Sequence, residues 1–486
     1  MYTDLQDFIG RLEKMGELKR ITATVDPELE IAEIASRVMK DGGPALLFEN
    51  VKGSVYPLLI NALGSERRMA TALGAESLDA KAAEIENVLG WLWATARHFS
   101  LLKSLPEAVP KLPLALSLIP KKVNRPLCQE VIDDNDGFDS LPILKCWSQD
   151  GGRFLTLPLV CAENNIKDGQ SIRNIGMYRM QVYDNRTAGM HWHINKDGAH
   201  FFQKYCEKGQ RMPIAVALGC DPAVTYSATA PLPEGLWEMV LAGFLRGKPA
   251  EVCKATLSDL LVPADAEFVL EGYVDPTEMR EEGPFGDHTG FYSLKDLYPV
   301  FHLQRITRRK APVYPATVVG RPPKEDCWMA KATERLFLPL LKQLCPEIVD
   351  MNMPIEGVFH NCVIVSIEKR FAGQARKVMH FLWGMGQMMN AKLIVVVDAE
   401  VNVQDLSEVA WRAFNNIDAR RDLVLNDGVL DALDHSSPLP RYGTRLGVDA
   451  TRKAADEGHS REWPSPIETD PQTAVLVDRR WSEYGL

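Results

Sequence analysis

Residues 171–200 read SIRNIGMYRMQVYDNRTAGMHWHINKDGAH, and this stretch predicts the fold of the middle of the chain. Two runs rich in apolar and aromatic residues, 177–183 and 189–195, are separated by Asp-Asn-Arg-Thr at 184–187. Turn-forming residues between two such runs are typical of a β-hairpin. We therefore expect a pair of antiparallel strands here.

The same pattern of short apolar runs separated by turn-forming residues extends on both sides of the hairpin. Between about residues 128 and 320, short runs of Val, Ile, Tyr and Phe alternate with Gly, Asp, Asn and Pro. Further runs lie at residues 214–218, 267–273 and 300–306. Regularly spaced short strands with turn signals predict a β-rich barrel or sandwich.

An α/β region precedes the β-rich part. Apolar residues recur at helical spacing in two segments. They are Leu5, Phe8, Ile9 and Leu12 in the first, and Ile31, Ile34, Ala35 and Val38 in the second. Thr3 and Gln6 have the spacing of a capping box before the first helix. Residues 45–48 and 58–63 are apolar and predict buried strands.

A second α/β region follows the β-rich part. Residues 363–367 and 393–397 are apolar runs typical of strands buried on both faces, and residues 375–389 between them have helical periodicity. Two more helices and one more strand are expected, at 329–341, 406–414 and 423–425. The tail from about residue 437 is Pro-rich and polar, so we expect it to wrap rather than fold.

These differences in composition and apolar periodicity divide the chain into three domains. The segment 102–127 is rich in Pro, Leu and Lys and serves as the first boundary. We expect an N-terminal α/β domain at 1–115, a β-rich central domain at 116–325, and a linker helix with a C-terminal α/β domain and extended tail at 326–486.

Composition excludes several classes of protein. The chain has 486 residues, with 55 Lys plus Arg against 65 Asp plus Glu, so its net charge is 55 − 65 = −10. An acidic chain is a poor binder of nucleic acid phosphates. A hydrophobic fraction of 46% is that of a globular protein. The nine cysteines form no CxxC motif, and there is no signal-peptide pattern or apolar run of membrane-spanning length. We expect a cytoplasmic protein with at most peripheral membrane contact.

The hairpin carries the densest set of candidate site residues. Alternation along a strand places His191, His193 and Asn195 on one face, where they could bind a metal or a phosphate. A polar hairpin that faces solvent is the alternative. The flanking Met, Trp and Tyr residues argue against full exposure.

Two other segments carry carboxylates. In EGPFGDHTGFY, residues 282–292, Glu282 and Asp287 lie five residues apart around Gly-Pro-Phe-Gly. A glycine-containing loop can direct both side chains into one pocket, where their pKa values would separate and suit acid–base chemistry. A surface turn is the alternative. Glu238 stands where an apolar helix begins, a position also explained by the helix dipole. The common dinucleotide, P-loop, zinc-protease and nucleophile-elbow motifs are absent from the sequence.

Taken together, these segments resemble the UbiD family of prenylated-flavin-dependent decarboxylases, along nearly the whole chain. The motifs that carry the resemblance are GELKRI at 16–21, GPALLFEN at 43–50, NIGMYR at 174–179, EGPFGDHTG at 282–290, GRPP at 320–323 and SPLP at 437–440. The resemblance implies a central split β-barrel like that of flavin reductases, which holds prenylated FMN. It also implies a C-terminal α/β domain that mediates assembly into dimers or hexamers.

The resemblance further implies roles for individual residues. Arg179, Glu282 and Asp287 match the catalytic trio of the family. The residues expected to hold the cofactor are Met177, Tyr178, Arg179, His191, Trp192, His193, Lys196 and Asp197. Asn174 and Glu238 match ligands of a divalent ion, usually Mn2+, that bridges the cofactor phosphate to the protein, and K+ is a further candidate ion. Asn195 is expected as the third ligand, in place of the His of many relatives, with His193 as the alternative.

The implied function is non-oxidative decarboxylation of a hydroxyaryl carboxylic acid by a carboxy-lyase. Loss of CO2 leaves negative charge on an aryl carbon, so the hard chemistry belongs to the cofactor. Arg179 can grip the carboxylate bidentately, and an acid must return a proton to carbon. The resemblance points to the quinone-biosynthesis branch, acting on 4-hydroxy-3-polyprenylbenzoate or 1,4-dihydroxy-6-naphthoate, with a flavin prenyltransferase as cofactor supplier. A reversible catabolic (de)carboxylase of simple phenolic acids is the alternative, and a non-catalytic flavin- or metal-binding protein is a third.

Overall fold

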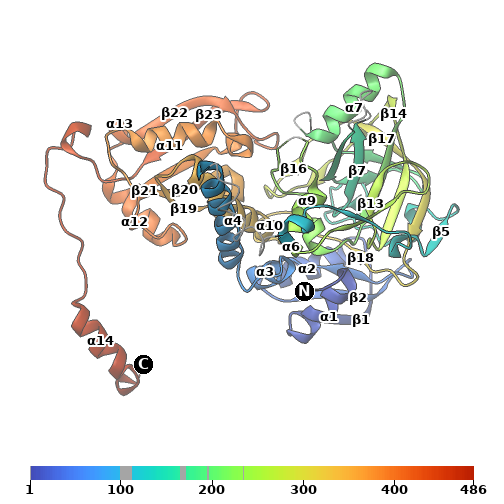
Figure 1. The fold of residues 1–486 in the computed structure, drawn as a ribbon, viewed down its shortest axis with the longest axis horizontal. Helices are drawn as coiled ribbons and strands as arrows, with labels where there is room; N and C mark the ends of the chain where they lie inside the picture. Colours follow the sequence, from blue (N-terminus) through green and yellow to red (C-terminus); the bar gives the residue numbers. More distant parts are fainter. Residues whose placement is uncertain (1, 99–111, 165–170, 194–195, 234, 486) are drawn as a thin grey trace.

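The computed structural model describes residues 2–98, 112–164, 171–193, 196–233 and 235–485 (Figure 1). The chain forms an N-terminal α/β part, a β-rich middle and a C-terminal α/β part, so the expected three-part fold class is confirmed. The long helix α4 lies between the N-terminal and C-terminal parts, where it packs on α10.

The N-terminal part is a four-stranded sheet, in the order β1-β2-β3-β18, with helices beside it. Its elements are α1 (Leu5–Lys14), β1 (Leu18–Val25), α2 (Glu30–Lys40), β2 (Ala45–Val51), β3 (Leu58–Ile60), α3 (Glu66–Ala72) and α4 (Leu78–His98). The predicted apolar stripe of α1 is its buried face. The predicted cap is wrong, because Asp4 rather than Thr3 caps α1 and accepts a hydrogen bond from the backbone of Asp7.

The middle is a nine-stranded sheet in the order β6-β9-β10-β17-β14-β11-β7-β8, with β5 paired to β17. Its strands are β5 (Val131–Asp133), β6 (Phe154–Leu155), β7 (Leu159–Asn164), β8 (Ile172–Met177), β9 (Met180–Val182), β10 (Thr187–Met190), β11 (Met212–Leu218), β14 (Phe268–Glu282) and β17 (Asp296–Arg308). The longest two, β14 and β17, pair along most of their length with two register shifts. Such shifts bend and twist a sheet.

Smaller elements surround this sheet. They are α6 (Leu112–Ser117), β4 (Lys121–Lys122), η2 (Leu127–Gln129), η3 (Phe138–Ser140), α7 (Asp197–Lys208), α8 (Pro222–Ser227), α9 (Glu238–Arg246), β12 (Glu251–Lys254), β13 (Leu261–Pro263), β15 (Phe285–Gly286), β16 (Tyr292–Ser293) and β18 (Tyr314–Pro315). The β15–β16 pair lies at the end of the long strands, which places the loop that follows Glu282.

The C-terminal part is a five-stranded sheet in the order β19-β20-β21-β23-β22. Its elements are α10 (Glu325–Leu344), β19 (Ile348–Asn352), η4 (Ile355–Gly357), η5 (Phe359–Asn361), β20 (Cys362–Ile367), α11 (Gln374–Trp383), η6 (Gly386–Asn390), β21 (Leu393–Asp398), α12 (Leu406–Asn416), α13 (Ala419–Asp422), β22 (Leu423–Val429) and β23 (Tyr442–Asp449). The predicted β-α-β unit is confirmed, because β20 and β21 pair in parallel.

Three predictions about elements are corrected. The strand expected over 177–183 is interrupted, since β8 ends at Met177 and β9 begins at Met180; only β9 forms the hairpin with β10. The strand expected over 189–195 is shorter, since β10 ends at Met190 and residues 191–193 follow it outside the sheet. The tail does not merely wrap. It contributes β23 to the sheet, and it continues as η7 (Ala455–Glu457), α14 (Pro471–Arg480) and η8 (Trp481–Tyr484). Helix α14 stands apart from the body of the molecule (Figure 1).

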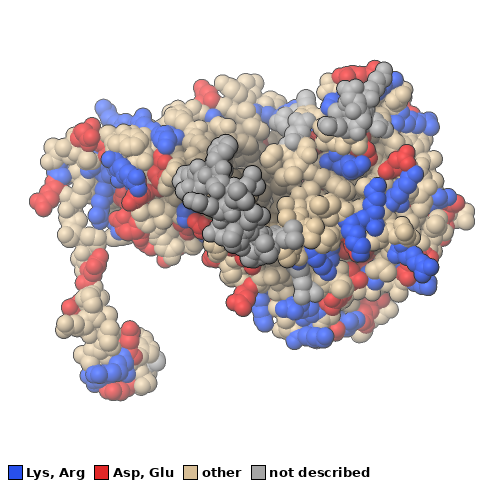
Figure 2. All heavy atoms as spheres, in the orientation of Figure 1, with Lys and Arg blue, Asp and Glu red and all other residues tan. Residues whose placement is uncertain are grey.

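Surface charge is mixed. On the face shown in Figure 2, acidic and basic side chains are interspersed over all three parts and over the detached α14. Within the described residues, no helix has both the length and the apolar character needed to cross a membrane.

Candidate active site

The predicted carboxylate loop begins where β14 ends. Glu282 is its first residue and is fully buried. The backbone N–H of Gly283 donates to the side-chain oxygen of Gln181 at 2.7 Å, and that of Gly286 donates to Asp150 at 2.8 Å. These bonds from neighbouring segments hold the loop in one conformation.

Arg179 lies between the two carboxylates of this loop. It follows β8 and donates to Glu282 twice, from Nε at 2.8 Å and from Nη2 at 3.2 Å. Its Nη1 forms an ion pair with Asp287, and Nη2 also donates to Ser293 Oγ at 3.1 Å. The guanidinium carbon lies 4.4 Å from the centre of the Phe285 ring. The structure therefore brings the three predicted catalytic residues into one buried cluster.

The cluster keeps both carboxylates ionised. Burial alone would raise the pKa of Glu282, but hydrogen bonds from His191 and Arg179 outweigh it and lower that pKa to about 2. Burial would likewise raise the pKa of Asp287, but the hydrogen bond and charge of His288, with the charge of Arg179, hold it well below its usual range. Two carboxylates thus share one guanidinium.

The two predicted histidines extend the cluster. His191 Nδ1 lies 3.1 Å from Glu282 Oε2, and its Nε2 lies 2.9 Å from His193 Nε2. Burial, with the nearby charges of His191 and Arg179, lowers the pKa of His193 to about 4. The ring of Tyr298 packs on His191 with a centroid distance of 4.4 Å. Alternation had placed His191 and His193 on one face, and the structure places them in contact.

The C-terminal part reaches the same cluster. His288 Nδ1 lies 2.8 Å from Asp287 Oδ1, and the His288 ring stacks on Phe359 at 5.2 Å and 22°. Val358 and Phe359 have φ values of 47° and 45°. A β-branched and an aromatic residue in the left-handed region store about 1–3 kcal/mol of strain each, which is a mark of functional segments.

Two of the predicted metal ligands, Asn174 and Glu238, lie in contact with each other. The side-chain amide of Asn174 donates to Glu238 Oε1 at 2.9 Å and to Asp197 Oδ2 at 3.3 Å. The other Glu238 oxygen accepts from the backbone N–H of Ile175 at 2.7 Å. Asn195 lies outside the described residues, and His193 bonds to His191 instead.

This group fits a hard divalent cation. The buried Asn174 Oδ1 has no hydrogen-bond partner among the described residues, and a half-turn of the amide would exchange it with the nitrogen. Asn174, Glu238 and Asp197 would then offer oxygen atoms, which Mn2+ and Mg2+ accept. Burial raises the pKa of Glu238 to about 7, and a cation beside it would lower that pKa again. No cluster of three or more His, Cys, Asp and Glu suited to a metal is found in the part of the chain that the structure describes.

The remaining predicted cofactor residues surround this group. Met177 ends β8, and a Cβ on Gly176 would lie 2.4 Å from the Tyr178 ring, so the glycine permits that ring to pack on the strand. Trp192 is buried and meets Tyr178 edge to face at 6.5 Å. Lys196 is the residue before α7, and burial lowers its pKa.

Sequence reasoning missed several residues of the site. Asp197 was expected at the cofactor but also contacts Asn174. The others are His288, Ser293, Tyr298, Phe359, His360 and Asp431. His288 was visible as part of the loop motif. The last three had no local signal, since they come from the C-terminal part.

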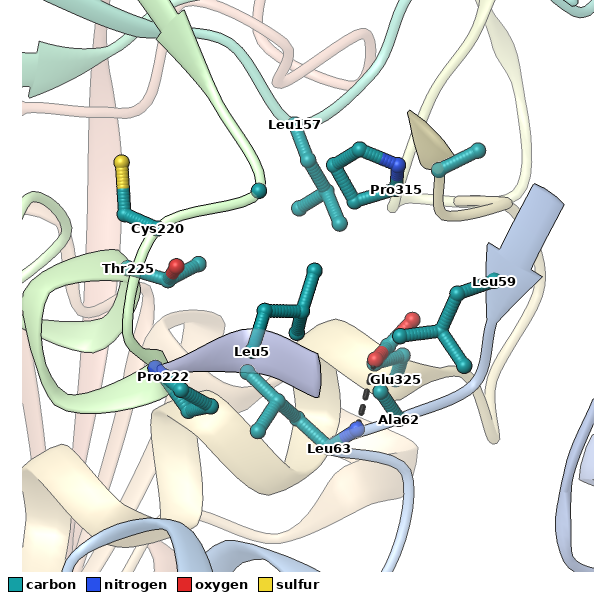
Figure 3. A pocket seen from close by; sticks show the side chains of 12 residues that line it. Leu5, Leu59, Ala62, Leu63, Leu157, Cys220, Pro222, Thr225, Pro315 and Glu325 are labelled. Atoms are coloured by element: carbon teal, nitrogen blue, oxygen red, sulfur yellow. Dashed lines mark hydrogen bonds between the residues drawn. The ribbon is translucent and has the colours of Figure 1, made fainter. Parts of the chain in front are cut away.

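A separate cavity lies between the N-terminal and middle parts, lined by Leu5, Leu63, Cys220, Thr225 and Glu325 among others (Figure 3). Its volume of about 30 Å³ suits one or two waters, not an aromatic acid. Glu325 Oε1 accepts from the backbone of Leu63 at 2.7 Å, while Oε2 has no partner among the described residues. A buried water would satisfy it, so this cavity is structural.

Comparison with known proteins agrees with this architecture. The 3-octaprenyl-4-hydroxybenzoate carboxy-lyase family matches in three domains: its N-terminal domain at residues 9–85, its Rift-related domain at 121–322 and its C-terminal domain at 327–450. An uncharacterized protein of Archaeoglobus fulgidus is 50% identical over 484 residues, which cover 99% of this chain and 98% of that one.

Solved structures of two enzymes illustrate the shared fold. Vanillic acid decarboxylase of Sedimentibacter hydroxybenzoicus in its closed form is 28% identical, with 99% of each chain covered and a TM-score of 0.86. Its open form gives a TM-score of 0.78. The UbiD-class enzyme HmfF of Pelotomaculum thermopropionicum, solved in complex with FMN, is 27% identical, covering 98% of this chain and 100% of that one, with a TM-score of 0.80.

A buried Arg–carboxylate cluster on a β-rich domain flanked by two α/β domains therefore defines a carboxy-lyase of the UbiD class. The chain belongs to the UbiD family, as its matches to all three family domains show.

Proposed function

We propose that the chain decarboxylates an aromatic carboxylic acid without oxidation, using prenylated FMN and a divalent metal. The observation that carries this proposal is the buried Arg179, held by Glu282 and Asp287 at the end of the long strands. A substrate carboxylate needs a cation, and the departing CO2 needs a proton donor to replace it on carbon. Arg179 supplies the cation, and a carboxylate of the same cluster, once it has taken up a proton, supplies the donor.

The substrate we propose is a hydroxyaryl acid of quinone biosynthesis, 4-hydroxy-3-polyprenylbenzoate or 1,4-dihydroxy-6-naphthoate. The family description, a 3-octaprenyl-4-hydroxybenzoate carboxy-lyase, supports the first of these. The likeness to vanillic acid decarboxylase supports the alternative, a reversible catabolic enzyme for simple phenolic acids. Both have a carboxylate on a hydroxylated ring, which Arg179 can receive.

Arg179 leaves little room for a bidentate grip in its present contacts. Its four hydrogen bonds and ion-pair contacts to Glu282, Asp287 and Ser293 occupy four of its five N–H groups. We propose that the substrate carboxylate replaces Asp287 at Arg179 Nη1 and so releases the Asp287 carboxylate. Glu282 keeps the guanidinium in place.

The cofactor we propose is prenylated FMN, supported by the FMN found in HmfF. When bound, it would accept the electrons that remain on the ring after CO2 leaves. Met177, Tyr178, Arg179, His191, Trp192, His193 and Lys196 would hold it. Asn174, Glu238 and Asp197, with Asn195 as a further candidate, would hold the Mn2+ or similar ion against its phosphate, with K+ as a further ion.

The proposed setting is a cytoplasmic homo-oligomer, a dimer or hexamer, that receives its cofactor from a flavin prenyltransferase. The C-terminal arm formed by α14 supports self-association, because none of its residues is buried within the single chain and its Val475 and Leu476 are exposed.

The experiment is CO2 release from a panel of carboxylated aromatics, by protein co-expressed with a flavin prenyltransferase. We expect turnover of a hydroxyaryl acid, and none by Arg179→Ala. Protein from a strain without the prenyltransferase is the control. Full activity in that strain with no flavin bound would refute the cofactor proposal, and release from no acid on the panel would favour a binding protein.

A further inference from the structure

The carboxylate loop, residues 282–292, and the C-terminal part meet around His288. Phe359 covers one face of the His288 ring, and His360 approaches its edge at 5.5 Å. Asp431, just after β22, has a carboxylate oxygen 3.4 Å from His360 Nε2. A second contact joins the same segments, since the rings of Phe291 and His435 lie 4.3 Å apart.

His288 is enclosed by acidic groups from three segments. Asp287 bonds to its Nδ1, Asp326 comes from the start of α10, and Asp431 from the C-terminal sheet. Arg179 is paired with Glu282 and Asp287, and the titratable ring of His360 also approaches His288. Burial alone would lower the pKa of His288, but the hydrogen bond to Asp287 and the charges of Asp326 and Asp431 raise it.

Both oxygens of Asp287 are therefore engaged. Oδ2 faces Arg179, and Oδ1 accepts from His288 through the ring and through the backbone N–H at 2.8 Å. A carboxylate held by two cations stays ionised.

We propose that Asp431 and Phe359 are positioning residues, which hold the His288 imidazolium against Asp287 when the C-terminal part is closed on the loop. The proposal rests on the proposed function, because the carboxylate it positions belongs to that reaction. Opening would remove the stacked ring and one of the three acids. His288 would then lose its proton more readily, and Asp287 would be free to accept one.

The test is the titration of His288 in the full, cofactor-free chain. Histidine labelled with 13C at Cε1 is followed by NMR, and the His288 signal is assigned from its loss in His288→Asn. We expect the His288 pKa to lie above the ordinary value of about 6.5 and to fall by about one unit in Asp431→Asn, as removal of one nearby charge at intermediate dielectric predicts.

Asp434→Asn is the matched control. Asp434 lies in the same segment but bonds to Lys392 at 2.5 Å, so its loss should leave the His288 titration unchanged. Phe359→Leu keeps an apolar cover without the aromatic face and should lower the His288 pKa by a smaller amount. An unchanged His288 titration in Asp431→Asn, or a parent pKa at or below the ordinary value, would overturn the proposal.

The loaded enzyme gives an independent readout. The basic limb of the kcat–pH profile should move to lower pH in Asp431→Asn by the same shift as the NMR titration, and should not move in Asp434→Asn. If the NMR shift is found but no aromatic acid is turned over by the parent, the proposed function fails while the positioning of His288 stands. If turnover is found with no shift in either measurement, the positioning role is wrong.

Discussion

Arg179 illustrates how one residue organises a site. Its side chain joins the end of β8 to the loop after β14, two segments about a hundred residues apart, and it is paired with two carboxylates. A buried guanidinium without partners would be expensive, and a single partner would leave no acid for chemistry. The cluster therefore has one carboxylate more than is needed to pair with Arg179.

Removing either carboxylate should separate its role from that of the other. Glu282→Gln should bind flavin as the parent does but lose about 10²–10⁴-fold in turnover, the usual contribution of general acid–base catalysis. Asp287→Asn should retain the cofactor with a smaller loss. Deuterium exchange at the product ring position, which needs proton transfer to carbon without CO2 loss, measures the step directly. Wild-type exchange in Glu282→Gln but not in Asp287→Asn would reverse the assignment.

Glu282 also predicts how stability depends on pH. Its folded pKa of about 2 lies below its unfolded value of about 4.3, so its contribution is fully present above the unfolded value and is lost as the pH falls through the folded one. Urea unfolding at pH 7 and pH 3 should therefore show a loss about 2 kcal/mol smaller in Glu282→Gln than in the parent. Equal losses in both proteins would contradict this pKa.

The sequence identified the residues of this cluster that share a motif, and it missed those that do not. Glu282 and Asp287 lie in one glycine-containing loop, and Arg179 follows a recognisable strand. Phe359 and Asp431 lie 72 and 144 residues beyond Asp287, and only the packing of two domains brings them together. No local pattern encodes such a contact.

At the level of elements, apolar periodicity predicted the helices and strands that bury a continuous apolar face. It located α1, α2 and the parallel pair β20–β21, because each buries a continuous apolar face. It failed for β23, whose alternating, partly polar strand resembles a loop in composition. It also failed between β8 and β9, where Tyr178 and Arg179 leave the strand to enter the site.

The first residue of helix α9 gives a testable prediction about the metal site. Glu238 faces Asn174 from the start of this helix, where the dipole alone would also favour an acid. If Glu238 binds the metal, Glu238→Ala should lose both the divalent ion and the flavin, because the phosphate charge is left unbalanced. Metal analysis and flavin absorbance of the purified protein measure this.

Glu251→Ala provides the control for that experiment. Glu251 is an exposed acid on β12, in the strand that follows α9, and pairs with Lys121. Its loss should leave both contents unchanged. Stoichiometric metal and flavin in Glu238→Ala would show that Glu238 serves only the helix.

At the level of the whole molecule, the C-terminal arm is the feature that a single chain does not explain. Residues of α14 and η8 such as Val475 and Trp481 are 67% and 52% exposed, and no residue of α14 is buried. A ten-residue helix is marginal in water by itself. Its apolar side chains therefore favour a partner surface, for which a second copy of the chain is our proposal.

Removal of residues 471–486 should thus weaken self-association. We expect light scattering to show the intact chain as a multiple of 54.3 kDa. The oligomer of the truncated chain should dissociate at a higher protein concentration than that of the intact chain. Trp481→Ala should act in the same direction, while Ser482→Ala, next to it, should not. A truncated protein with the same mass and dissociation constant as the parent would show that the arm has no part in assembly.

The closing of the C-terminal part on the catalytic loop also has a consequence for the order of biosynthesis. Asp287 leaves the ribosome 144 residues before Asp431, which at about 5–20 residues per second is an interval of roughly 7–30 s. During that interval the β-rich domain can fold with its cluster uncovered. In such a nascent chain the site would be open to the proposed flavin, and the C-terminal part, which is translated after the β-rich domain, would cover it later.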